Sequence, residues 1–154
     1  MKECGALLSA ILHVAHPDLY EAGKMSLSRM CIHPTIAAAL STWPTVFNNV
    51  HVISNRVTPF HRDTSGLPSW YDLLMSVGPY NRAELVLRNI GVQIGYKPGT
   101  MAFICSQVVH HGVGQVDGDR ICYSWFMAEA VHRNFEVPSV SWMRTDRYPT
   151  EGYV

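Results

Sequence analysis

Apolar residues recur at helical spacing over the first third of the chain, and this pattern predicts three helices. The first is expected at residues 3–15, where His13 argues against the alternative of a secretory signal. The second is expected at residues 18–30, although Gly23 weakens it. A third, shorter helix is expected at residues 32–40.

From residue 45 the pattern changes to short runs of β-branched, partly alternating residues between glycine and proline turns. No helical segment separates these runs, which argues against βαβ units and favours a β-sandwich or jelly roll. Asp117-Gly118 predicts a hairpin connection at residues 114–119, before the last strand. The expected strands lie at residues 46–54, 61–63, 71–77, 85–87, 92–96, 101–113 and 121–127.

The length of 154 residues predicts a single domain. We divide it into a helical prefix at 1–44, a β core at 45–132 and a tail at 133–154. Apolar residues make up 47% of the chain, enough for a core, and charged residues only 16%, which argues against disorder. The expected fold class is therefore mainly β (α+β), with a helical layer at the N-terminus.

Charge and cysteine content restrict the partners and the redox environment that we expect for the chain. The chain carries 12 Lys+Arg and 12 Asp+Glu, without the basic surplus of a typical duplex-binding domain. A contact with nucleic acid would thus be small, or would depend on another part of the native protein. No run approaches the roughly 18 apolar residues of a membrane span. The cysteines form no C-x-x-C motif, which favours a reducing, intracellular setting; they are Cys4, Cys31, Cys105 and Cys122.

The H-x-D formed by His61 and Asp63 is the first candidate for chemistry. Side chains alternate along a strand, so an imidazole and a carboxylate would converge on one point. These are two of the three ligands of a facial 2-His-1-carboxylate metal site. A surface histidine and a loop-capping aspartate are the alternative reading of the same motif.

The third ligand is expected in the histidine pair His110-His111, because His111 lies 48 residues beyond Asp63, far enough for intervening strands. Neighbours in a strand face opposite ways, so only one of the pair can point inward. We favour His111, since the small Gly112 beside it allows close approach. His110 would then face outward or donate a hydrogen bond to the site.

Arg120 follows His111 by nine residues, and the expected hairpin would bring it back beside the metal. Its permanently charged, fork-shaped guanidinium suits a carboxylate of 2-oxoglutarate; a surface arginine paired with Asp117 or Asp119 is the alternative. The order of H-x-D, distal His and Arg is that of Fe(II)/2-oxoglutarate oxygenases.

Weaker candidates accompany this set. Ser124 could add a hydroxyl to the same carboxylate or simply pack in its strand. Asn55 could bind the cosubstrate or bridge strands. Trp70 and Tyr71 could stack on a flat substrate or belong to the core, and His132 is expected to be exposed.

The stretch N-R-V-T-P-F-H-R-D-T at residues 55–64 resembles the metal-site strand of the TET/JBP group of Fe(II)/2-oxoglutarate dioxygenases. It most resembles the branch expanded in fungal genomes beside transposable elements. The resemblance covers about residues 17–132, with one departure at Ala128, where the family often has an arginine. Its other motifs are W-Y-D-L-L at 70–74, Y-K-P-G-T at 96–100, H-G-V at 111–113, residues 120–127 and V-H at 131–132.

The resemblance implies a double-stranded β-helix (jelly roll) with helices on one side. His61, Asp63 and His111 would hold Fe(II), and Arg120 would hold 2-oxoglutarate. Family members use these and O2 to oxidise methyl groups on DNA bases, typically 5-methylcytosine or thymine, and a base in a duplex must first be flipped out. The expected partner is therefore DNA with a modified or methylated base, and the resemblance implies an intracellular, nuclear location.

Two alternatives to this function stay open. One is a 2-oxoglutarate-dependent hydroxylase of protein or small molecules, which the neutral charge favours. The other is an inactive jelly-roll binding module, the remnant of a transposon-associated copy. The zinc-binding and basic extensions that help some relatives hold DNA are not expected, and the sequence indicates no oligomeric state.

Overall fold

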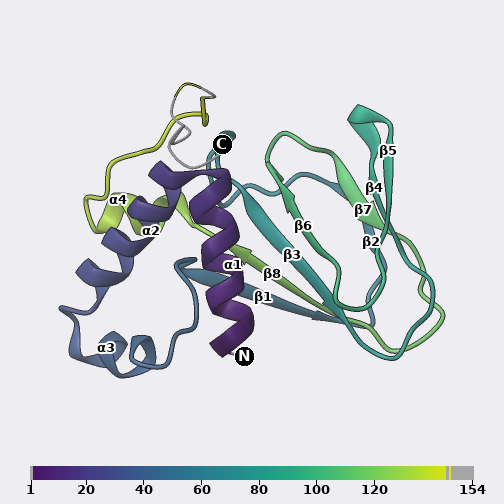
Figure 1. Cartoon of the computed structure of the whole chain (residues 1–154), viewed down its shortest axis with the longest axis horizontal. Helices are drawn as coiled ribbons and strands as arrows, with labels where there is room; N and C mark the ends of the chain where they lie inside the picture. Colours follow the sequence, from purple (N-terminus) through teal and green to yellow (C-terminus); the bar gives the residue numbers. More distant parts are fainter. Residues whose placement is uncertain (1, 145, 147–154) are drawn as a thin grey trace, which may run out of the picture.

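The computed structural model describes residues 2–144 and 146. Within them, three helices precede eight strands, and a fourth helix follows the last strand (Figure 1). The helices are α1 (Lys2–Ala15), α2 (Pro17–Met30), α3 (Pro34–Leu40) and α4 (Glu129–Asn134), with a short 3-10 helix η1 (Arg88–Ile90). The strands are β1 (Asn49–Ser54), β2 (Thr58–His61), β3 (Asp72–Val77), β4 (Glu84–Leu87), β5 (Val92–Gly95), β6 (Met101–Ile104), β7 (His111–Val113) and β8 (Ile121–Phe126).

The strands form two four-stranded antiparallel sheets, in the orders β1-β8-β3-β6 and β2-β7-β4-β5. Strands consecutive in sequence fall in different sheets in most cases, as in a jelly roll. Apolar side chains from both sheets meet between them, among them Leu74, Leu85, Val113 and Cys122. The mainly β prediction with an N-terminal helical layer is therefore confirmed.

The helices cover the outer face of only one sheet. In Figure 1, α1 and α2 lie against the sheet that contains β1, β8 and β3. Leu8, Leu12 and Leu19 are fully buried there with Phe47 and Trp70. A second apolar core thus lies between the helices and this sheet.

Gly23 lies at the closest approach of α2 to this core. A Cβ atom at Gly23 would lie 2.5 Å from Cε of Met127 and 2.7 Å from the carbonyl oxygen of Val46. The glycine that weakens the helix on propensity alone is therefore required by packing. α2 begins at Pro17, and Nδ1 of His16 accepts a hydrogen bond from the Leu19 amide at 3.3 Å, which caps the helix.

The apolar run at residues 101–113 is not one strand, and that prediction is wrong. It divides into β6 and β7, which belong to different sheets. Ser106, in the turn between them, donates to the buried carboxyl of Asp72, and its carbonyl accepts the Asp63 amide at 3.2 Å. These contacts across the fold break a run that local β propensity would continue.

The hairpin prediction at residues 114–119 is also wrong, because β7 and β8 lie in different sheets. The segment crosses between the sheets, and Asp117 accepts hydrogen bonds from the amides of Asn81 (3.0 Å) and Arg82 (3.1 Å). Gly118 lies against Pro79, where a Cβ atom would come 2.4 Å from its carbonyl oxygen. The chain does bend at Asp117-Gly118, but the bend lies in a connection between the two sheets and not in a hairpin.

Two further differences concern the C-terminal region. α4 spans the expected boundary between core and tail, and residues 145 and 147–154 of the expected tail lie outside the described residues. His132, expected to be exposed, is 1% exposed and packs against Trp70.

The four cysteines are free thiols. No helix among the described residues is long and apolar enough to cross a membrane.

Candidate active site

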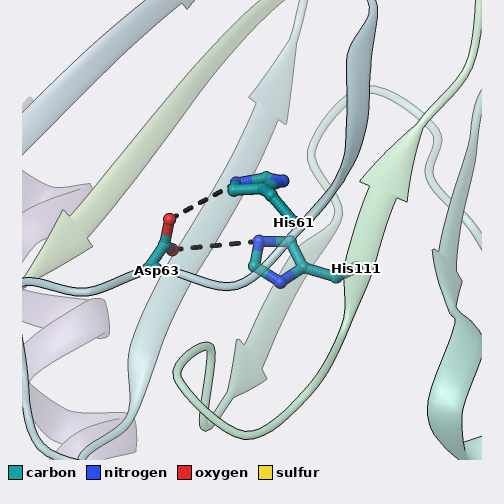
Figure 2. A group of neighbouring side chains, drawn as sticks. All are labelled: His61, Asp63 and His111. Atoms are coloured by element: carbon teal, nitrogen blue, oxygen red, sulfur yellow. Dashed lines mark ion pairs between the residues drawn. The ribbon is translucent and has the colours of Figure 1, made fainter.

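His61, Asp63 and His111 converge at one end of the β2-β7-β4-β5 sheet (Figure 2). β2 ends at His61 and β7 begins at His111, and the two histidines face one another as partners in the ladder. Asp63 lies just beyond β2, where its amide donates to the Ser106 carbonyl at 3.2 Å. The H-x-D motif thus spans the end of a strand rather than its middle.

The three side chains could hold one metal ion. Nε2 of His61 lies 3.3 Å from Oδ1 of Asp63, and Nε2 of His111 lies 3.8 Å from Oδ2. One potential ligand atom from each residue lies within 4.8 Å of the others. Two imidazoles and one carboxylate are the donor set of a facial triad, which leaves coordination positions open.

Backbone carbonyls fix both imidazoles in the form that a metal requires. Nδ1 of His61 lies 2.9 Å from the Pro59 carbonyl, and Nδ1 of His111 lies 2.9 Å from the Val109 carbonyl. A carbonyl only accepts, so each Nδ1 carries the proton and each Nε2 presents a lone pair towards Asp63. Burial lowers the pKa of His111, which further favours its neutral form.

A cavity of about 450 Å³ opens between the two sheets beside these residues. His61, Asp63 and His111 line it from one sheet, and Arg120 and Ser124 line it from the other. The structure therefore brings five of the six candidate site residues to one cavity. Ser124 lies on β8 and is 7% exposed, so its hydroxyl faces this enclosed space.

Arg120 is buried and carries no ion pair with any carboxylate among the described residues. Its Nε donates to Oγ of Ser76 at 2.9 Å, and its guanidinium carbon lies 5.1 Å from the centre of the Tyr96 ring. An enclosed guanidinium is costly unless an anion compensates it. The residues present thus fit a carboxylate-bearing cosubstrate, and the alternative of a surface arginine is wrong.

Asn55 does not line this cavity, but its side chain is hydrogen-bonded to the backbone of Arg120. Its side-chain oxygen accepts the Arg120 amide at 2.7 Å, and its side-chain nitrogen donates to Asp119 at 2.8 Å. Its backbone is left-handed, with φ of 49°, a conformation that asparagine tolerates better than most residues. This geometry favours the strand-bridging alternative over direct contact with the cosubstrate.

Sequence reasoning missed three residues that support the site. Ser76 and Tyr96 position Arg120, and Asp72 lies beside Asp63 at a smaller recess that both line. Burial raises the pKa of Asp72 to about 7, a shift that the hydrogen bond from Ser106 opposes and the charge of Asp63 increases. Asp72 and Tyr96 lie within the W-Y-D-L-L and Y-K-P-G-T motifs of the resemblance, but nothing local assigned them a role at the site.

The remaining candidates lie away from the cavity. Trp70 is 1% exposed and donates from Nε1 to the Val140 carbonyl at 3.1 Å, so it belongs to the core. Tyr71 packs against the same core. His110 does not join the triad: its amide donates to Asn89 at 2.8 Å and its ring lies 5.8 Å from that of Phe60.

Comparison with known proteins identifies a family for most of the chain. The family model Tet_JBP, described as the oxygenase domain of the 2OGFeDO superfamily, matches residues 1–129. The match extends further towards the N-terminus than the sequence motifs do, and takes in all of the helical layer. No curated protein matches the chain.

Proposed function

Because the chain belongs to the Tet_JBP family of Fe(II)- and 2-oxoglutarate-dependent dioxygenase domains, we propose that it oxidises a methyl group on a nucleobase in DNA. The base is 5-methylcytosine or thymine. One observation carries this proposal: a chain of this family keeps a complete donor triad around one cavity, together with a buried arginine that has no ion pair among the described residues. A remnant without function would be under no requirement to keep them together.

In this proposal His61, Asp63 and His111 are the three protein ligands of Fe(II). The iron, when bound, supplies the activation of O2 that couples decarboxylation of 2-oxoglutarate to oxidation of the methyl group. Asp63 neutralises part of the metal charge, while the carbonyls of Pro59 and Val109 keep both imidazoles oriented.

Arg120 and Ser124 bind the distal carboxylate of 2-oxoglutarate, since a guanidinium fork and a hydroxyl suit a planar carboxylate. The bond from Arg120 to Ser76 and the contact with Tyr96 fix the direction of the guanidinium. Leu74 and Leu85 line this cavity with apolar side chains, which we expect to disfavour water beside the cosubstrate. The protein thus contributes orientation and a dry environment, and the cofactor contributes the reactivity.

The target base enters from the side of the cavity where His51 and Arg56 are exposed. An intact duplex would hide the methyl group from the site, so the base must leave the stack. A nuclear location and descent from the fungal transposon-associated branch are part of the same proposal.

The test is product analysis with the purified full chain, Fe(II), ascorbate and 2-oxoglutarate. We expect succinate release that a methylated oligonucleotide stimulates, together with an oxidised base in the nucleoside digest by mass spectrometry. His111→Ala should lose both signals, whereas the matched control His110→Ala should keep them. Succinate release without base oxidation would move the substrate to protein or small molecules, and no turnover with bound iron would favour the binding module.

A further inference from the structure

The outer face of the β2-β7-β4-β5 sheet has no helix over it among the described elements (Figure 1). This contrasts with the other sheet, which α1 and α2 cover. Large apolar side chains are exposed in and beside the bare sheet; they are Val57, Phe60, Ile90, Val92 and Val108. A sheet face with exposed apolar side chains is a candidate for a binding surface.

Phe60 lies at the β2 edge of this face. It lies on β2 and is 44% exposed, with the Arg88 guanidinium 5.2 Å from the ring centre. Its ring rests on Gly112 of β7, where a Cβ atom would come 3.1 Å from Cδ1 of Phe60. Because Gly112 has no side chain, the Phe60 ring can lie directly on the backbone of β7. A groove of about 420 Å³ extends from Phe60 past Val86 and Gly114.

Three arginines belong to this region: Arg88 lies over the ring, Arg82 lines the same groove, and Arg62 follows Phe60 by two residues. Arg62, Arg82 and Arg88 are exposed, and none forms an ion pair with a carboxylate among the described residues. Glu84 is the acidic residue that lines the groove. Asp117 also lies nearby, where it accepts the Arg82 amide at 3.1 Å. Three arginines against two carboxylates leave this face with a small positive excess, although the whole chain is neutral.

We propose that this face, which we call the Phe60 platform (Phe60, Arg62, Arg82, Arg88 and Gly112), binds single-stranded DNA next to the target base. An exposed aromatic ring among arginines is how proteins hold single strands, with bases stacked on the ring and phosphates on the cations. The proposal rests on the proposed function, because it concerns the same DNA strand.

The position of β2 connects the platform to the cavity. β2 is an edge strand paired only with β7, and its consecutive residues Phe60 and His61 point to opposite faces. A DNA strand that runs over Phe60 needs only to turn around the β2 edge of the sheet, past Arg62, to place a neighbouring base at the metal site. The geometry thus favours single-stranded DNA over a rigid duplex.

Binding of a labelled single-stranded 5-methylcytosine oligonucleotide to the full chain, with Fe(II) and 2-oxoglutarate under anaerobic conditions, tests the platform by fluorescence anisotropy. Phe60→Ala should weaken binding roughly 5- to 150-fold, the loss expected for one stacked base. The matched control Trp142→Ala, another exposed aromatic (53%), should bind as the wild type does. A duplex of the same sequence should compete less well than the single strand.

The arginines are tested by salt dependence. Arg88→Gln should reduce the slope of log affinity against log salt by about 0.7, one phosphate contact on a single strand. Lys97→Gln, which removes an exposed charge outside the platform, should leave the slope unchanged. Equal slopes for the wild type and Arg88→Gln would overturn the role of the platform.

A cross-linking measurement on the wild type does not depend on how the variants fold. Trypsin cuts after Arg56 and Arg62, so residues 57–62 form one peptide that contains Phe60. A photoreactive nucleotide beside the methylated base should cross-link to Phe60 in this peptide, as identified by mass spectrometry. If the wild type oxidises the base but cross-links elsewhere, the platform is wrong and the proposed function stands. If it neither binds nor oxidises DNA, both proposals fail.

Discussion

Replacement of Asp72 by asparagine should change how stability depends on pH. The Asp72 carboxyl is 5% exposed and accepts a hydrogen bond from Ser106. Burial is the main reason that its pKa is raised to about 7 from its usual value of 3.8. A difference of about 3 pKa units corresponds to about 4 kcal/mol between the protonated and ionised forms.

The sign follows from proton binding. Between about pH 4 and pH 7 the folded chain keeps a proton on Asp72 that the unfolded chain releases, so the free energy of unfolding falls as pH rises. Below about pH 4 Asp72 is protonated in both the folded and the unfolded chain, so its ionisation no longer lowers the free energy of unfolding. Asp72→Asn has no proton to lose, so its stability relative to wild type should rise by about 4 kcal/mol from pH 4 to pH 7.5.

Urea unfolding of both proteins at several pH values measures this difference. Chelator should be present, because a cation at nearby Asp63 would favour the ionised form of Asp72. Glu3→Gln, which removes an exposed acid, is the control and should follow the wild type. Parallel pH profiles for wild type and Asp72→Asn would refute the argument that Asp72 is held neutral by burial.

Three further predictions concern the site and the core. His111→Ala should abolish binding of Fe(II) in titration calorimetry while His110→Ala binds normally; the reverse result would exchange the two assignments. Arg120→Ala should raise the KM for 2-oxoglutarate roughly ten- to hundredfold, the loss expected for a charge-assisted hydrogen bond, and an unchanged KM would place the carboxylate elsewhere. Gly23→Ala should lower the free energy of unfolding by about 1–3 kcal/mol, because its Cβ atom would lie 2.7 Å from the Val46 carbonyl oxygen; a more stable variant would contradict this packing.

Local sequence signals located half of the eight strands well. The strands expected at 71–77, 85–87, 92–96 and 121–127 agree with β3, β4, β5 and β8 to within a residue at each end. The first three lie between glycine or proline turns, which mark where pairing stops, and β8 follows such a turn at Gly118. This is why the jelly roll could be predicted without any contact being known.

The errors share one physical cause, which is contact between residues far apart in the chain. The break between β6 and β7 depends on Ser106 meeting Asp72, 34 residues away, and no local pattern encodes that. His132 is buried because α4 folds back onto Trp70. The H-x-D motif was readable as chemistry, but the support that Ser76 and Tyr96 give to Arg120 was not, since it exists only after folding.

The two halves of the cavity belong to different sheets, and this has a thermodynamic consequence. His61 and His111 come from the β2-β7-β4-β5 sheet, whereas Arg120 immediately precedes β8 of the other sheet. A dicarboxylate held at one end by Arg120 and at the other by the metal would act as a cross-link between them. Metal and cosubstrate should therefore strengthen one another's binding, and by reciprocity each should resist the separation of the two sheets.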